Sequence, residues 1–331
     1  MKTNITKFHL KLLVAIMVMA LALGVCGIVS VAVADEASDF PGREVTIIVP
    51  YDAGGSSDMI SRFIASGLGK ALNCTVLVVN KPGGAGSVGM TFVRQSKADG
   101  YTICYISTDI MTQKVMNISD IVPEDFAFIG QVAEVPGALT VHVDSPFKTA
   151  TEFIDYAKKN PGKLTVAVGA VGGAWHTTAT VLEEGAGVKL NKVSFSGGGA
   201  AAVTPLMGKH VDAAVNGAGE VLSGVNAGSL KILGVMTEER MPSLPDVPTL
   251  KEQGVNVVFG GSGAYALPKD APQPIVDKLS AALSKAVESD EFKDFITQRG
   301  MIIRYRNTAD TKKAIAEQNE VFFNILSKID K

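Results

Sequence analysis

The sequence predicts an α/β protein of two lobes, each a mostly parallel sheet flanked by helices, with a ligand cleft between the lobes. Short unbroken runs of Val and Ile alternate with helical stretches over residues 45–107, which is typical of parallel strands covered on both faces. The alternation of apolar runs and helical stretches begins again after the sequence pattern changes near residues 132–143. A chain of 331 residues is long enough to hold two such units.

The N-terminal segment reads as an export signal. Three lysines precede an uncharged apolar run over residues 12–33, which ends in Ala32-Val33-Ala34. We expect cleavage after Ala34 and a mature chain in the periplasm. An uncleaved membrane anchor and lipidation at Cys26 remain open as alternatives.

The charge balance argues against a nucleic acid or an anionic membrane surface as partner. The chain has 31 basic and 33 acidic residues, and residues 1–34 contain three lysines and no acidic residue, which leaves 28 basic residues against 33 acidic ones. The mature chain keeps Cys74 and Cys104. Both fall in expected strands on either side of the first one, too far apart for a disulfide, so we expect two free, buried thiols.

The pattern assigns each element in order along the chain. The first unit has strands at 45–51, 75–80 and 101–107 and helices at about 57–72 and 88–97. The second has helices at about 151–159, 174–185 and 200–207 and strands at 163–169, 192–195, 211–216 and 230–236. Amphipathic helices at about 274–289 and 308–329 complete the chain. We therefore divide it into a signal peptide at 1–34, lobe 1 at 35–134 and 262–331, and lobe 2 at 135–261, with crossings near 132–143 and 245–264.

Three junctions between a strand and a helix share one chemistry. They read PYDAGGSSD at 50–58, GAVGGAWHTT at 169–178 and SFSGGGAAA at 194–202. Glycine lets the backbone approach a ligand closely, and the helix that follows offers free N–H groups and the positive end of its dipole. Each loop alone could be only a tight turn. In the first loop Ser56, Ser57 or Asp58 could cap the helix, and we interpret Asp58 as a cap. Three loops in two lobes favour an anion-binding cleft.

A fourth glycine-rich stretch, at 84–89, matches a dinucleotide fingerprint, and Asp109 follows the next strand. Residues 80–83 separate these glycines from the preceding strand, and export works against a nicotinamide cofactor, so we expect no cofactor. The sequence also has no G-x-S-x-G, no H-E-x-x-H and no cysteine pair at zinc spacing, and we expect no metal. His176 could donate a hydrogen bond to an anion or could pack, and Trp175 could line the ligand or pack between the lobes.

Several motifs together resemble the receptors of tripartite tricarboxylate transporters, also called Bug-type proteins. The segments FPGREVTIIVPYDAGGSSDMISR, VVNKPGGAGSVG, ADGYTI, KKNPGKLTVAVGAVGGAWH, MGKHVDAAV and RMPSLPDVPTLKEQG occur in the family's order and approximate spacing. The resemblance runs from about Phe40 to the C-terminus. It implies a two-lobed periplasmic binding protein of type II, with no catalytic activity, that closes on a small carboxylate. It also implies a membrane permease of one large and one small subunit as partner, and a monomeric receptor.

The resemblance also implies which residues hold the ligand, through main-chain N–H groups, hydroxyls and bridging waters. By position these are Tyr51, Gly54, Gly55, Ser56, Ser57, Ala85, Gly86, Ser87, Ser107, Thr108, Gly172, Gly173, Ala174, His176, Ser196 and Gly197. The chain departs from the family at Asp52, where proline or alanine is common, and at Trp175, where a small residue is common. Asp52 could point outward or select a ligand with a donor group such as an amine or a hydroxyl, and Trp175 could shrink the pocket or favour a planar ligand.

Two other functions stay open from the residues alone. One is an exported hydrolase that uses Ser57 or Ser87 with His176, and the other is a dinucleotide-dependent oxidoreductase. No motif holds a base beside either serine. The sequence does not name the solute.

Overall fold

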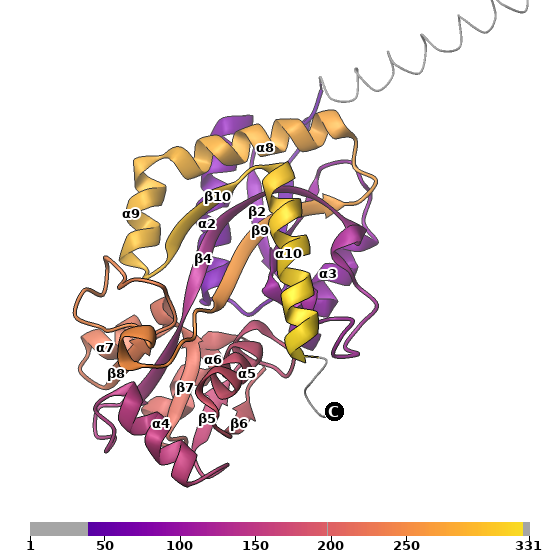
Figure 1. Ribbon diagram of the computed structural model, residues 1–331. Coiled ribbons are helices and arrows are strands. Elements are labelled where there is room, and N and C mark those ends of the chain that lie inside the picture. The colour runs from indigo at the N-terminus through magenta and orange to yellow at the C-terminus, as the bar shows by residue number, and fades with distance from the viewer. Residues whose placement is uncertain (1–38, 197, 327–331) are drawn as a thin grey trace, which may run out of the picture.

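The computed structural model describes residues 39–196 and 198–326, and Figure 1 shows that they form two lobes. The expected signal peptide and Gly197 lie outside the described residues. Within the described part of the chain, no helix is long and apolar enough to cross a membrane.

The first lobe has three parallel strands at one side of its sheet, in the order β2 (Val76–Asn80), β1 (Val45–Val49) and β3 (Thr102–Ser107). The antiparallel strands β9 (Gly260–Pro268), β4 (Phe126–His142) and β10 (Ile302–Arg306) continue it. Apolar residues of α2 (Ser56–Leu72), α8 (Gln273–Glu288) and α9 (Asp290–Gln298) pack on one face. Those of α3 (Ser87–Arg94) and α10 (Thr308–Leu326) pack on the other, so that the sheet is buried on both faces.

The second lobe repeats this plan. Strand β5 (Thr165–Val168) lies between β6 (Asn191–Ser194) and β7 (Ala213–Gly217), all parallel, and β7 and β8 (Leu230–Val235) each pair antiparallel with β4. Helices α4 (Ala150–Lys159) and α5 (Ala174–Ala186) cover one face. Helices α6 (Gly199–Met207) and α7 (Leu222–Asn226) lie on the other.

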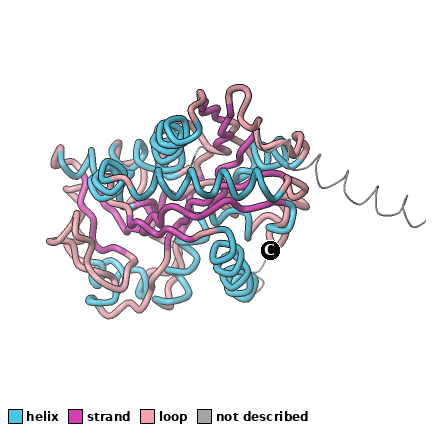
Figure 2. The backbone as a smooth tube through the Cα atoms, turned by 90° about the horizontal axis from the view of Figure 1, so that it is seen from above, coloured by secondary structure: helices cyan, strands magenta, loops and turns pink. Residues whose placement is uncertain are grey.

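One strand belongs to both lobes. β4 pairs with β9 from Phe126 to Pro136 and with β7 from Gly137 onward, and Figure 1 shows it running from the upper lobe into the lower one. The chain crosses between the lobes a second time at Phe259 and Gly260. The N–H of Phe259 donates a hydrogen bond to Met236 in the second lobe, and Gly260 pairs with Pro136 of β4. Seen from above in Figure 2, the strands form a central layer between helices. The two lobes are therefore joined by two neighbouring strands.

The structure corrects several details of the sequence prediction. Each sheet is mixed, with three parallel strands and antiparallel additions, because a buried antiparallel strand has the same continuous apolar run as a parallel one. Residues 132–142 belong to β4, a 17-residue strand. Helix α3 ends three residues earlier than expected, and β4, β9, α9 and β10 were not anticipated. Cys74 precedes β2 and is half-buried, whereas Cys104 is buried as expected, and both thiols are free.

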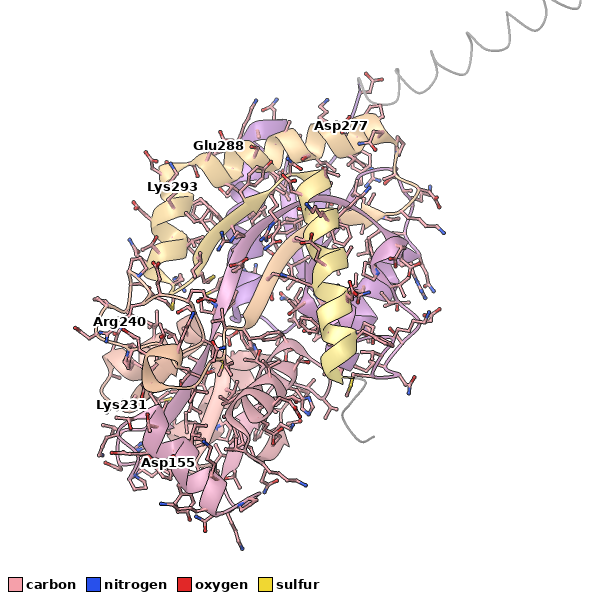
Figure 3. All side chains as sticks on the ribbon, in the orientation of Figure 1. Asp155, Lys231, Arg240, Asp277, Glu288 and Lys293 are labelled. Atoms are coloured by element: carbon pink, nitrogen blue, oxygen red, sulfur yellow. The ribbon has the colours of Figure 1, made fainter. Side chains whose placement is uncertain are left out.

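Charged side chains gather on the outside of both lobes. The six that Figure 3 labels, Asp155, Lys231, Arg240, Asp277, Glu288 and Lys293, are all exposed, and none of them lines the cavity between the lobes that is described below. The charge that a ligand meets in that space is therefore set by a different group of residues.

Candidate functional site

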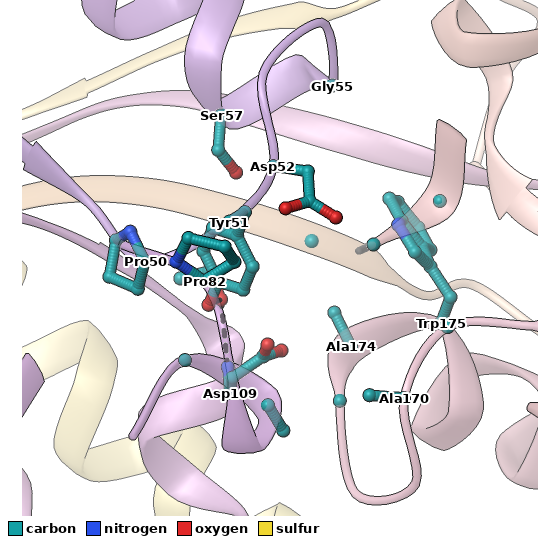
Figure 4. Close-up of a pocket in the computed structure, with 18 of the residues that line it drawn as sticks. Pro50, Tyr51, Asp52, Gly55, Ser57, Pro82, Asp109, Ala170, Ala174 and Trp175 are labelled. Carbon is teal, nitrogen blue, oxygen red and sulfur yellow. Dashed lines mark hydrogen bonds between the residues drawn. The ribbon is translucent and has the colours of Figure 1, made fainter. Parts of the chain in front are cut away.

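A cavity of about 310 Å³ lies between the lobes. Its walls come from the loops after β1, β2 and β3 in the first lobe and after β5, β6 and β7 in the second, and Figure 4 shows the two sides facing each other. Parallel strands bring their carboxyl ends to one edge of a sheet, where ligands of open α/β sheets bind. Both lobes thus direct their ligand-binding edges into one space.

Most of the residues that the family resemblance implies meet in this cavity. It is lined by Tyr51, Gly55, Ser56, Ser57, Ala85, Gly86, Ser107, Gly173, Ala174 and Ser196. All three glycine-rich loops contribute, together with the fingerprint-like loop.

Five of the expected residues do not line the cavity: Gly54, Ser87, Thr108, Gly172 and His176. Thr108 faces a second cavity behind β4 and β9. Gly172 packs against Ile118, and its carbonyl accepts a hydrogen bond from Thr112. His176 is half-buried in the first turn of α5, and burial and then Lys192 lower its pKa to about 4. The described structure therefore gives His176 no place at the cavity wall.

Four helices begin at the cavity, and their N-termini are uncapped. The N-cap residues are Gly86 for α3 and, at the three glycine-rich loops, Gly55 for α2, Gly173 for α5 and Gly198 for α6, and none has a side-chain cap. By contrast, the hydroxyls of Thr149 and Ser289 cap α4 and α9, which begin elsewhere. Because glycine cannot satisfy the first N–H groups of a helix, those donors remain available to groups in the cavity.

Asp58 does not cap α2. Its carboxylate accepts hydrogen bonds from Gly54 N–H, Arg62 and Asn80, each at 3.0 Å. Burial alone would raise the pKa of Asp58, but these hydrogen bonds and the Arg62 charge lower it. The carboxylate ties the loop to β2 and does not line the cavity.

Glu220 of the second lobe crosses to the first. It lies in the turn Ala218–Val221 after β7, and its Oε1 accepts hydrogen bonds from Ser56 Oγ at 3.2 Å and Ser56 N at 3.5 Å. Its Oε2 accepts one from Gly217 N at 2.9 Å. Burial raises the pKa of Glu220 to about 7 in spite of these bonds. The N-terminus of α2 thus already holds a carboxylate from the protein itself.

Asp109 makes the reciprocal contact from the first lobe. It lies just after β3 with 3% of its surface exposed, and the N–H of Ala174, at the start of α5, donates to its carboxylate. Burial raises its pKa to about 6, although hydrogen bonds from Tyr51, Ala174 and Ser107 oppose the rise. Oδ1 has no hydrogen-bond partner in the described structure. Each lobe therefore sends one carboxylate to a helix N-terminus of the other.

Sequence reasoning missed Glu220 and placed Asp109 only in a rejected cofactor motif. Both stand directly after a strand whose carboxyl end faces the cleft, and that position was the available signal. Trp175 is buried in the cavity wall, within van der Waals reach of Gly217 and Gly261. Asp52 is exposed, and Figure 4 shows its carboxylate directed into the cavity toward Trp175.

The cavity lining offers groups that bind an anion. Among the described residues no lysine or arginine lines it, and no three potential metal ligands gather at one point. Ser57 lines the cavity, but neither Ser87 nor His176 does, so the residues of the hydrolase hypothesis are not brought together. The site offers helix N–H groups, hydroxyls and three carboxyl groups.

Known proteins resemble this chain along most of its length. The model of the tripartite tricarboxylate transporter family receptor matches residues 60–330. A Cupriavidus necator protein, named UPF0065 protein in gbd 5'region, is 30% identical over 299 residues, which cover 90% of this chain and 91% of that protein.

Two solved structures share the fold. The periplasmic binding protein BugD is 30% identical with a TM-score of 0.81 and covers 87% of this chain and 98% of its own. MatC from Rhodopseudomonas palustris, solved with bound malate, is 26% identical with a TM-score of 0.80 and covers 87% of this chain and 100% of its own. The fold is that of the α/β periplasmic binding proteins, and the chain belongs to the tripartite tricarboxylate transporter receptor family, a family of binding proteins and not of enzymes.

Proposed function

We propose that this receptor binds a small carboxylate in the cavity between its lobes and delivers it to a membrane permease of one large and one small subunit. The observation that carries the proposal is the set of three glycine-capped helix N-termini directed into one cavity. Such termini stabilise negative charge through their free N–H groups and their dipoles. The malate bound to MatC supports a small acid as the solute.

Export places the receptor where such a solute would be met. Relatives such as BugD are periplasmic binding proteins, and we infer the same compartment here, with cleavage after about Ala34. N-terminal sequencing of the protein from a periplasmic extract should start near Asp35. Recovery of the chain with Met1, in the membrane fraction, would contradict cleavage.

Thermal melting with a panel of small organic acids tests the proposed function. A ligand that binds only the folded state raises the melting temperature, so at least one acid should do so, whereas NAD and ester substrates should not. Stabilisation by NAD alone, or turnover of an ester, would overturn the proposal.

A pair of variants tests whether the acid binds in the cavity. Gly55 has φ −77°, and a Cβ built there lies 3.9 Å from its nearest neighbours, so Gly55→Val should fold and still obstruct the α2 N-terminus. Ala53→Val is the matched control, because Ala53 is exposed in the same loop and does not line the cavity.

Calorimetry should show loss of binding for Gly55→Val and unchanged binding for Ala53→Val. Ser57→Ala should have a milder effect, on the order of 1 kcal/mol, because it removes one hydroxyl. If Gly55→Val bound the acid as tightly as the unaltered protein, the acid would not bind at the α2 N-terminus.

A further inference from the structure

The cavity is strongly acidic for a site that receives an anion. Asp52, Asp109 and Glu220 all line it, and among the described residues no lysine or arginine does. The four helix N-termini at the cavity supply together about +2 elementary charges. Three ionised carboxyl groups would exceed that compensation, so the cavity opposes a ligand with two negative charges and no positive one.

Two of the three acids are not satisfied by the protein. Glu220 accepts hydrogen bonds from Ser56 and Gly217. Asp109 is 3% exposed, and its Oδ1 has no hydrogen-bond partner, while Asp52 has no hydrogen bond or ion pair within the described residues. Figure 4 shows the carboxyl groups of Asp52 and Asp109 on the same side of the cavity, facing the wall that Ala174 and Trp175 form. The buried Oδ1 of Asp109 is costly to leave without a donor, and a ligand that brings a donor removes this cost.

We propose that the solute carries a protonated nitrogen as well as its carboxylate, and that Asp52 and Asp109 receive this nitrogen. An ammonium group supplies three donors and a positive charge, which match the unpartnered Oδ1 of Asp109 and the carboxylate of Asp52. A divalent cation fits less well, because the described residues bring no three potential ligands together. The inference rests on the proposed function, since the solute's carboxylate still takes helix N–H groups that Glu220 and Asp109 leave free.

Matched pairs of compounds test the inference by calorimetry at about pH 8, which is above the raised pKa values of Glu220 and Asp109. The pairs are succinate with 4-aminobutanoate, glutarate with 5-aminopentanoate, adipate with 6-aminohexanoate, and malate with aspartate. Each second compound has as many carbon atoms as the first. It carries an ammonium group where the first has the oxygens of one terminal carboxylate or, in malate, the hydroxyl. In at least one pair the ammonium compound should bind about tenfold more tightly or better.

Charge-neutralising variants locate the effect. Asp52→Asn keeps the side-chain shape at an exposed position and should weaken binding of the preferred ammonium compound about tenfold, with a smaller effect or a gain for its dicarboxylate partner. Asp109→Asn should act in the same direction. Asp270→Asn is the control, because Asp270 is an exposed loop aspartate of the first lobe that does not line the cavity.

The possible results separate the inference from the proposed function. Tighter binding of the dicarboxylate or hydroxy acid in every pair would overturn the inference and leave the proposed function standing. Equal loss of ammonium binding in Asp52→Asn and Asp270→Asn would also overturn it. Absence of binding by every compound would contradict the proposed function itself for acids of these lengths.

Discussion

Glu220 and Asp109 hold protons at a pH where ordinary carboxyl groups have lost them. Burial raises their pKa values to about 7 and about 6, from ordinary values of 4.5 and 3.8. Between the ordinary and the raised values the folded state binds more protons than the unfolded chain. Their contribution to stability is therefore complete below about pH 4 and is lost as the pH rises through 6 and 7.

The raised pKa of Glu220 predicts how the stability of a Glu220 variant depends on pH. The free energy of unfolding of Glu220→Gln should fall less between about pH 5 and about pH 8 than that of the unaltered protein, with a difference on the order of 1 kcal/mol. Urea unfolding at the two pH values measures it. Carboxyl groups with lowered pKa values, such as Asp58, act alike in both proteins and cancel in the comparison. An identical pH dependence would show that Glu220 ionises normally.

Helix α2 begins at the proposed site with a glycine as its N-cap residue. Glycine has no side chain, so no side chain caps this helix. Gly55 has φ −77° and ψ 172°, a conformation that serine adopts readily at an N-cap. Gly55→Ser should therefore stabilise the fold by a few tenths of a kcal/mol, because its hydroxyl accepts the first N–H groups of α2. The same hydroxyl competes with the ligand, so affinity should fall several-fold.

Helix α4 provides the opposite case. Thr149 caps it through Glu152 N at 3.2 Å, away from the cavity, so Thr149→Ala should cost about 1 kcal/mol of stability and leave affinity unchanged. Denaturant unfolding and calorimetry on both variants check the pair of predictions. A Gly55→Ser protein with undiminished affinity would show that the α2 N-terminus does not contact the ligand.

Local patterns predicted these elements well because their causes are local. The glycines, the strands before them and the helices after them are adjacent in sequence, and the three loops are found as expected at the starts of α2, α5 and α6. The reciprocal contacts of Glu220 and Asp109 depend on how the two lobes meet. Ser56 and Glu220 are 164 residues apart, and no periodicity links them. The long strands β4 and β9 were likewise not predicted, and a buried strand has the same apolar run in either direction, so their antiparallel pairing gave no signal.

In the whole molecule, β4 and β9 join the lobes near Pro136 and Gly260. The lobes meet across the cavity through Ser56 with Glu220 and through Thr112 with Gly172, so the structure has a closed cleft. We propose that the unliganded receptor opens at these two strands and that the solute favours closure.

Small-angle scattering tests this hinge. A saturating ligand that calorimetry has confirmed should lower the radius of gyration of the unaltered protein, and the same solute should not compact Gly55→Val. No change in the radius of gyration of the unaltered protein would refute closure, although the site itself could stand.

Backbone amide NMR tests whether the N-termini of α2, α5 and α6 hold the solute between the lobes. The ¹⁵N-labelled protein is titrated with the acid that gives the largest thermal stabilisation. The amides of Ser57, Trp175 and Gly199 should show the largest early shifts, because they lie in the first turns of the three helices and are not the ones that donate to Glu220 and Asp109. Shifts concentrated instead around the second cavity, at Thr237 and Arg304, with these three amides unmoved, would contradict the account.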